Sequence, residues 1–279
     1  MSTKNFHKLA IAQLCSTDDV PKNLQICKDL ISQAKEKEAS AIFFPEATDF
    51  IGKNFQQGLT LTHEHSEKFI EGLKETAKDK EIWVGVGVHQ KAKVEDKLLN
   101  SYLLINSLGE IAQTYNKIHL FDIDIPNGPK LKESDKTLAG DKILEPVDTP
   151  FGKVGLAICY DIRFPQMSLK LRELGADIIL YPSAFTVKTG EAHWEILNRC
   201  RAIETQTYVI SPAQSGKHNE KRESYGHSMV IDPWGKKLID LEKTLLEESK
   251  LEVFDYDPEL IKNCRLNMPI LNHFRKDTY

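Results

Sequence analysis

The sequence has few cysteines, and they follow no pattern. Five occur in 279 residues, none in a Cys-x-x-Cys pair, and their number is odd. This usage argues against a disulfide framework and against a structural zinc site. The histidines are scattered too, with His193, His227 and His273 far apart in the chain, so we expect no bound metal. The cysteines are Cys15, Cys27, Cys159, Cys200 and Cys264.

Long hydrophobic runs and an excess of one charge are also missing. No apolar segment approaches the length that crosses a bilayer, and the opening MSTKNFHKLAIAQLCS lacks the apolar stretch of a signal peptide. The chain carries 37 basic and 41 acidic residues, a net charge of −4, which predicts neither a nucleic-acid nor a membrane partner. No glycine-rich phosphate-binding loop occurs, so we expect no cofactor. Together these features predict a cytoplasmic protein.

Strands that alternate with helices are what the sequence does contain. This pattern, with two hairpins, predicts a single α/β domain with a mixed sheet over residues 1–279. The last residues, 261–279, have no clear periodicity but many apolar side chains, and we expect them to dock on another subunit. The expected helices are 21–38, 63–79, 165–174 and 190–204; the expected strands are 8–14, 41–44, 82–88, 100–106, 110–116, 154–159, 177–181, 208–211, 227–232, 236–240 and 252–257.

Three polar residues of complementary chemistry, Glu46, Lys117 and Cys159, stand at the ends of expected strands. In α/β sheets, strand ends are the usual location of binding and catalytic sites. A carboxylate can take the proton of a thiol as general base. A fixed ammonium and the backbone N–H of the next residue, Tyr160, can stabilise an oxyanion. Taken singly, each residue also fits an inert role as a capping carboxylate, a solvent-facing lysine or a core thiol.

The segments around these residues resemble a known family. FFPEA (43–47), YNKIHLFD (115–122) and ICYDIRFP (158–165) are similar to the three signature regions of the nitrilase superfamily, the carbon–nitrogen hydrolases. The resemblance implies a four-layer α-β-β-α sandwich in which Glu46 is the general base, Lys117 stabilises the transition state and Cys159 is the nucleophile. It also implies a homodimer or a larger even-numbered assembly, because the family pairs subunits through helices like 190–204 and a C-terminal tail.

A fourth residue of the site follows from the same resemblance. Many members keep a second glutamate between the lysine and cysteine motifs, and Glu133 in KLKESDKTLAG is similar to it. This residue would hold the lysine in place or position a water. Its alternative is a surface carboxylate among the charges of 130–136. His119, two positions after Lys117, is expected to be a hydrogen-bonding structural residue and not a catalytic base.

Further segments are similar to one branch of the family, the deaminated glutathione amidases. They are AFTVKTGEAHWEILNRCRAIETQTYVI (184–210) and KHNEKRESYGHSMVIDPWG (217–235). The resemblance implies a small-molecule amide substrate with a keto-acid acyl group, cleaved through a thioester acyl-enzyme to 2-oxoglutarate and cysteinylglycine. Other hypotheses are an ω-amidase acting on 2-oxoglutaramate or 2-oxosuccinamate, a nitrilase or carbamoylase, and a non-catalytic scaffold.

Candidate substrate-binding residues lie close to the nucleophile. The Arg163 guanidinium can bind a carboxylate in bidentate fashion, or it forms a structural ion pair with Asp161. Phe185 and Thr189 are expected at the wall of the acyl pocket. The loop GKHNEKRES offers a basic cluster for the carboxylate of the leaving group, and such clusters are also common in solvated loops. The cluster consists of Lys217, His218, Lys221 and Arg222.

Overall fold

The computed structural model describes residues 6–124, 130–243, 248–275, 277 and 278, and it contains two large sheets. The strands of the first are β1 (His7–Gln13), β2 (Ala41–Phe43), β3 (Trp83–Lys91), β4 (Leu98–Ile105), β5 (Ile111–Asn116) and β16 (Lys250–Tyr256). Those of the second are β8 (Val147–Thr149), β9 (Gly152–Leu156), β10 (Ile178–Leu180), β11 (Tyr208–Ser211), β14 (Met229–Ile231) and β15 (Lys237–Asp240). Their orders are β16-β1-β2-β3-β4-β5 and β15-β14-β11-β10-β9-β8. Both sheets are mixed, whereas the sequence pattern alone predicted one mixed sheet.

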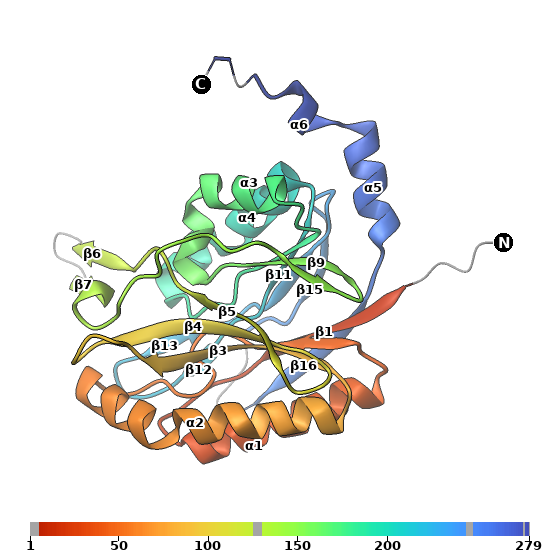
Figure 1. The fold of residues 1–279 in the computed structure, drawn as a ribbon. Helices are drawn as coiled ribbons and strands as arrows, with labels where there is room; N and C mark the ends of the chain where they lie inside the picture. Colours follow the sequence, from red (N-terminus) through yellow and green to blue (C-terminus); the bar gives the residue numbers. More distant parts are fainter. Residues whose placement is uncertain (1–5, 125–129, 244–247, 276, 279) are drawn as a thin grey trace.

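Helices cover the outer face of each sheet (Figure 1). Helices α1 (Val20–Glu36) and α2 (Phe55–Asp79) lie on the first sheet, and α3 (Pro165–Glu173) and α4 (Val187–Thr205) lie on the second. The inner faces of the two sheets share one apolar core, to which Leu9 and Ile11 of β1 contribute. The alternate residues Ala10 and Ala12 pack instead beneath α1 and α2, because successive strand side chains point to opposite faces. This is the expected four-layer α-β-β-α sandwich.

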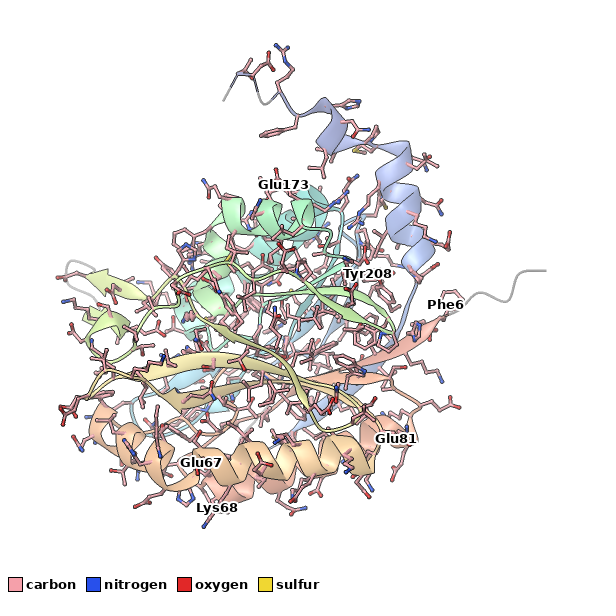
Figure 2. All side chains as sticks on the ribbon, viewed as in Figure 1. Phe6, Glu67, Lys68, Glu81, Glu173 and Tyr208 are labelled. Atoms are coloured by element: carbon pink, nitrogen blue, oxygen red, sulfur yellow. The ribbon has the colours of Figure 1, made fainter. Side chains whose placement is uncertain are left out.

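Local sequence explains where the helices begin. The carboxylate of Asp19 accepts a hydrogen bond from the Lys22 amide at 3.0 Å and caps α1, and Pro21 occupies its first turn. Along α2 the charged Glu67 and Lys68 face outward, as Figure 2 shows, whereas the next two residues are buried. The amphipathic pattern therefore decides which side of each helix packs on the sheet.

Two helical regions differ from the sequence prediction. Helix α2 begins at Phe55 and not at residue 63, because the side chain of Asn54 caps it. Leu59 and Thr62 in its first turns are buried, and this packing outweighs the low helix propensity of Gly58 and of the threonines. The region predicted without periodicity contains α5 (Pro258–Asn267) and the short α6 (Ile270–His273). Figure 1 shows both leading away from the sheets.

Short elements complete the fold and shape the site. The strand pairs β6 (Asp122–Asp124) with β7 (Lys130–Lys132), and β12 (Ser215–Lys217) with β13 (Glu223–Tyr225), were not predicted. Two 3-10 helices, η1 (Glu133–Asp135) and η2 (Cys159–Arg163), carry candidate site residues. Within the described residues, no helix is long and apolar enough to cross a membrane.

Candidate active site

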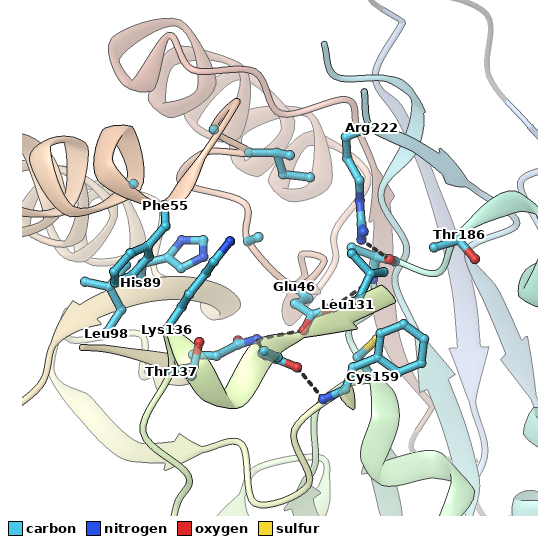
Figure 3. Close-up of a pocket in the computed structure, with 18 of the residues that line it drawn as sticks. Glu46, Phe55, His89, Leu98, Leu131, Lys136, Thr137, Cys159, Thr186 and Arg222 are labelled. Atoms are coloured by element: carbon cyan, nitrogen blue, oxygen red, sulfur yellow. Dashed lines mark hydrogen bonds between the residues drawn. The ribbon is translucent and has the colours of Figure 1, made fainter. Parts of the chain in front are cut away.

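Glu46, Lys117 and Cys159 meet in one cavity of about 420 Å³ between the two sheets. Glu46 and Lys117 follow β2 and β5 of the first sheet, whereas Cys159 follows β9 of the second. Glu46 is 5% exposed, Lys117 3% and Cys159 9%. Figure 3 shows Glu46 and Cys159 side by side in this cavity. The three residues are separated in sequence, and the stacking of the sheets is what brings them together.

The Lys117 ammonium lies between two carboxylates. Its Nζ is 3.0 Å from Oε1 of Glu46 and 3.0 Å from Oε2 of Glu133. The backbone amide of Phe121 donates to Glu133 at 2.7 Å and fixes that carboxylate. Glu133 therefore belongs to the cluster and does not act as a free surface charge, the alternative that the sequence left open.

The charges of this cluster stabilise one another. Burial alone would lower the pKa of Lys117, but the carboxylates of Glu133 and Glu46 outweigh it and hold the pKa well above its usual range. Burial would likewise raise the pKa of Glu46, but the Lys117 charge and hydrogen bonds from Cys159 and Asn100 lower it. Glu46 is thus ionised, and Lys117 is a fixed cation.

Cys159 occupies a strained turn. It is the first residue of η2, and its φ of 47° lies in the left-handed region that a residue with a Cβ rarely adopts. Burial and the nearby Glu46 carboxylate raise the pKa of its thiol, so the resting sulfur keeps its proton. The turn also places the Tyr160 amide in the first turn of a helix, where amides lack intrahelical acceptors. That is the position predicted for an oxyanion donor.

Asp161 connects the cysteine turn to the lysine loop, and sequence reasoning assigned it no such role. Its fully buried carboxylate accepts from the Ile158 amide at 2.9 Å and from the Tyr115 hydroxyl at 2.7 Å. It also contacts Nδ1 of His119 at 2.7 Å. The hydrogen-bonding role predicted for His119 is confirmed. The motif ICYDIRFP contained the signal, since Asp161 is its one acid.

Three more groups shape the site and were missed because each is unremarkable in sequence. Asn100, within β4, donates to Glu46 at 2.8 Å and to Glu133 at 3.2 Å. The Ala184 backbone amide donates to the second oxygen of Glu46 at 2.9 Å. A Cβ on Gly87 would lie 2.6 Å from the Cα of Glu46, so only glycine lets β3 approach the Glu46 loop.

The predicted binding residues line the cavity at the side of η2 and α4. Arg163 lies over the rings of Phe185 and Tyr160, at 5.5 and 5.9 Å from their centroids. In the part of the chain that the structure describes, Arg163 forms no ion pair with Asp161 or any other carboxylate; its Nη2 is 3.2 Å from Nδ1 of His193. Thr189 also lines the cavity, in the first turn of α4.

The basic cluster expected in the loop 217–222 is only partly correct. Lys221 and Arg222 line the cavity, and the Arg222 guanidinium donates to the Ala184 carbonyl at 2.6 Å. His218 is instead buried, and burial lowers its pKa to about 4, so it is neutral. Lys217 is exposed and is not among the residues that line the cavity. The cluster at the cavity therefore comprises Lys221 and Arg222 alone.

Two stacked mixed sheets with a buried acid, amine and thiol between them define a hydrolase of the nitrilase superfamily. The family model "Carbon-nitrogen hydrolase" matches residues 8–262. The chain belongs to the carbon–nitrogen hydrolase family, and it is an amidohydrolase.

Curated relatives and a solved structure agree with this assignment. The chain is 54% identical to "Probable hydrolase nit2" of Schizosaccharomyces pombe, over 97% of this chain and 98% of that protein. It is 41% identical to the human deaminated glutathione amidase, over 97% of this chain and 83% of the human one. The crystal structure of the Caenorhabditis elegans NitFhit protein superposes with a TM-score of 0.93 at 41% identity, and covers 100% of this chain and 67% of that one.

Proposed function

We propose that this enzyme hydrolyses deaminated glutathione to 2-oxoglutarate and cysteinylglycine. This substrate has a carboxylate at each end and the scissile amide between them. The observation that carries the proposal is the charge of the cavity, where basic side chains, among them Arg163 and Lys136, line the same space as the buried Glu46–Lys117–Cys159 cluster. The name of the human relative, a deaminated glutathione amidase, supports the same substrate.

The reaction that we propose begins with a neutral thiol. As the Cys159 sulfur attacks the amide carbonyl, Glu46 takes the thiol proton. The developing oxyanion is stabilised by the Lys117 ammonium and the Tyr160 amide. Glu46 then gives the proton to the leaving nitrogen, the C–N bond breaks, and cysteinylglycine departs. The 2-oxoglutaryl group remains on the sulfur as a thioester.

Hydrolysis of the thioester uses the same residues in the same roles, with water as the nucleophile. A water molecule loses a proton to Glu46 while its oxygen attacks the thioester carbonyl, and Lys117 again stabilises the oxyanion. The C–S bond breaks, and the sulfur recovers a proton from Glu46. Glu133, which contacts Lys117 through both carboxylate oxygens at 3.2 and 3.0 Å, keeps the ammonium in place throughout.

The acyl group would lie against η2 and α4. In this arrangement Arg163 binds the keto-acid carboxylate, Phe185 forms the apolar wall and the Thr189 hydroxyl is a polar contact. Arg163 is suited to this role because it belongs to the same short helix, η2, as Cys159 and pairs with no carboxylate in the described chain. The acyl carboxylate and the thioester would then be held by one rigid element.

Substrate preference separates this proposal from an ω-amidase. We expect kcat/KM for deaminated glutathione to exceed that for 2-oxoglutaramate by tenfold or more, because the larger leaving group adds contacts that lower the barrier as well as improving affinity. Side-by-side kinetics on the two amides measures this. An equal or reversed preference would reassign the enzyme as an ω-amidase, and a nitrile of the same acid tests for nitrilase activity.

We propose a homodimer as the functional unit. Large apolar side chains stay exposed on α4, on the adjoining turn and on the C-terminal helices, including Ile196 at 71%, Trp234 at 64% and Leu266 at 77%. Leaving them in water is unfavourable, and a second subunit would cover them.

The thiol mechanism also favours a reducing compartment such as the cytoplasm.

Light scattering at micromolar concentration should give twice the mass of one chain. Ile196→Glu should shift the equilibrium toward monomer, because it places a charge in the proposed contact. Ile111, which is 41% exposed on β5 in the first sheet, offers a matched control, and Ile111→Glu should leave the mass unchanged. A monomer in the unmodified protein would disprove the dimer.

A further inference from the structure

One histidine faces the cavity and has no part in the mechanism above. His89 lies on β3 directly opposite Asn100 of β4, and residues opposite each other in a sheet share a face. Its side chain therefore comes next to the amide that binds Glu46 and Glu133. Figure 3 places His89 beside Phe55 and Lys136, on the far side of Glu46 from Thr186.

The orientation of His89 is fixed by Asp49. One oxygen of Asp49 accepts the backbone amide of His89 at 2.7 Å, and the other is 2.9 Å from its Nδ1. The imidazole stacks on Phe50 with 4.3 Å between ring centroids. With Nδ1 engaged, Nε2 is the nitrogen left to face a ligand, and 21% of the side chain remains exposed.

The charges around His89 favour a protonated ring. Burial opposes protonation, but Asp49, Glu46 and Glu133 outweigh it and raise the pKa of His89 above its ordinary value of 6.5. Other lysines line the cavity as well: the charge of Lys117 is more than offset by its two carboxylates, and Lys53 and Lys132 pair with aspartates, whereas no ion pair is seen for Lys136 in the described residues. Lys136 stands at the rim, with Nζ 5.9 Å from the centre of the Phe55 ring. The Nε2–H of a protonated His89 and the Lys136 ammonium are therefore the groups of this corner that can bind an anion.

The geometry decides which end of the substrate lies there. The acyl group stays bonded to Cys159, and its carboxylate is assigned to Arg163 at the other end of the same short helix, η2. The leaving group must lie on the other side of the reacting carbonyl. We propose that His89 is a specificity-determining residue, whose Nε2–H, together with Lys136, binds the terminal carboxylate of the leaving group. This inference rests on the proposed function, since it uses the second carboxylate of that substrate.

The test compares two substrates that differ only at this carboxylate. One is deaminated glutathione, and the other is the same compound with its glycine carboxylate capped as a primary amide. We expect the unmodified enzyme to prefer the compound with the free carboxylate. His89→Gln should reduce that preference about tenfold, which corresponds to the loss of one hydrogen bond to a charged group. The change should appear in KM more than in kcat. The preference should also fade as the pH rises through the pKa of His89, because the neutral ring no longer carries the charge.

Two further variants separate binding from a general structural effect. Asp49→Asn keeps the shape of the pair but removes the negative charge, so it should shift the loss of preference to lower pH. His227→Gln is the matched control, because His227 also bonds an aspartate, Asp240 at 2.8 Å, and stacks on a ring, but it lies outside the cavity lining. It should leave the preference as it is.

The outcomes are distinct. Thermal unfolding shows whether the His89→Gln variant is folded. If it is folded and its kcat/KM falls equally for both compounds, His89 is a structural residue and the inference is wrong. An unchanged pH dependence in Asp49→Asn would likewise contradict a role for the ring charge. If unmodified enzyme cleaves neither compound, the proposed function itself fails, and the assignment of the second carboxylate fails with it.

Discussion

Replacing Cys159 by alanine should lower kcat/KM for any amide substrate by about 10⁴-fold or more while leaving the protein folded. Of the five cysteines, Cys159 is the one that lines the cavity with Glu46 and Lys117. The mechanism has no substitute for its sulfur. Alanine keeps the Cβ and therefore tolerates the same left-handed backbone about as well as cysteine does, so the turn should persist.

Cys200 provides the control for this prediction. It is a partly buried cysteine on α4 whose sulfur bonds the Glu204 carboxylate at 3.1 Å, away from the cavity lining. Cys200→Ala should therefore retain its kcat/KM. Steady-state rates for both variants, with circular dichroism for folding, make the comparison. A folded Cys159→Ala protein with full activity would end the proposed mechanism.

The second large effect is expected for Lys117→Met, a variant that removes the cation and keeps most of the side-chain volume. The rate should again fall by about 10⁴-fold, because the oxyanion loses its fixed charge and the residues of the cluster act as a unit. Stability should fall as well, by about 3–5 kcal/mol at neutral pH, since buried carboxylates are left without their partner.

The stabilities of the unmodified protein and of Lys117→Met should change with pH in opposite directions. In the unmodified protein the pKa of Glu46 lies below its ordinary value of 4.5, so the carboxylate stabilises the fold above that pH and the contribution disappears as the pH falls. In Lys117→Met the burial of Glu46 is no longer offset, and its pKa should rise. The variant should therefore become relatively more stable as the pH is lowered toward 5.

A double variant distinguishes catalysis from stability. Adding Glu133→Gln to Lys117→Met removes one of the uncompensated charges, so part of the lost stability should return. The catalytic rate should not return, because the Lys117 cation is still missing. Urea unfolding and steady-state kinetics on the same samples measure both quantities. Recovery of activity together with stability would show that Lys117 has only a structural role.

The sequence was sufficient to predict the buried strands and to identify the motifs at their ends. Apolar runs indicated the buried strands, and the three motifs FFPEA, YNKIHLFD and ICYDIRFP together singled out Glu46, Lys117 and Cys159, each of which alone also fits an inert role. Helix α2 was predicted too short and α5 was not predicted, because burial of Leu59 and Ile261 and not local propensity stabilises those turns.

The sequence by itself therefore predicted an α/β domain with a mixed sheet, and the resemblance of its motifs to a known family implied the two-sheet sandwich and the three candidate site residues, because motifs are read from adjacent residues. The tertiary structure alone decided the contacts of Asn100, Asp161 and His89, and the neutral state of His218. A hydrogen bond or a pKa depends on distances of a few ångströms between segments far apart in the chain. Those distances exist only after the sheets have stacked.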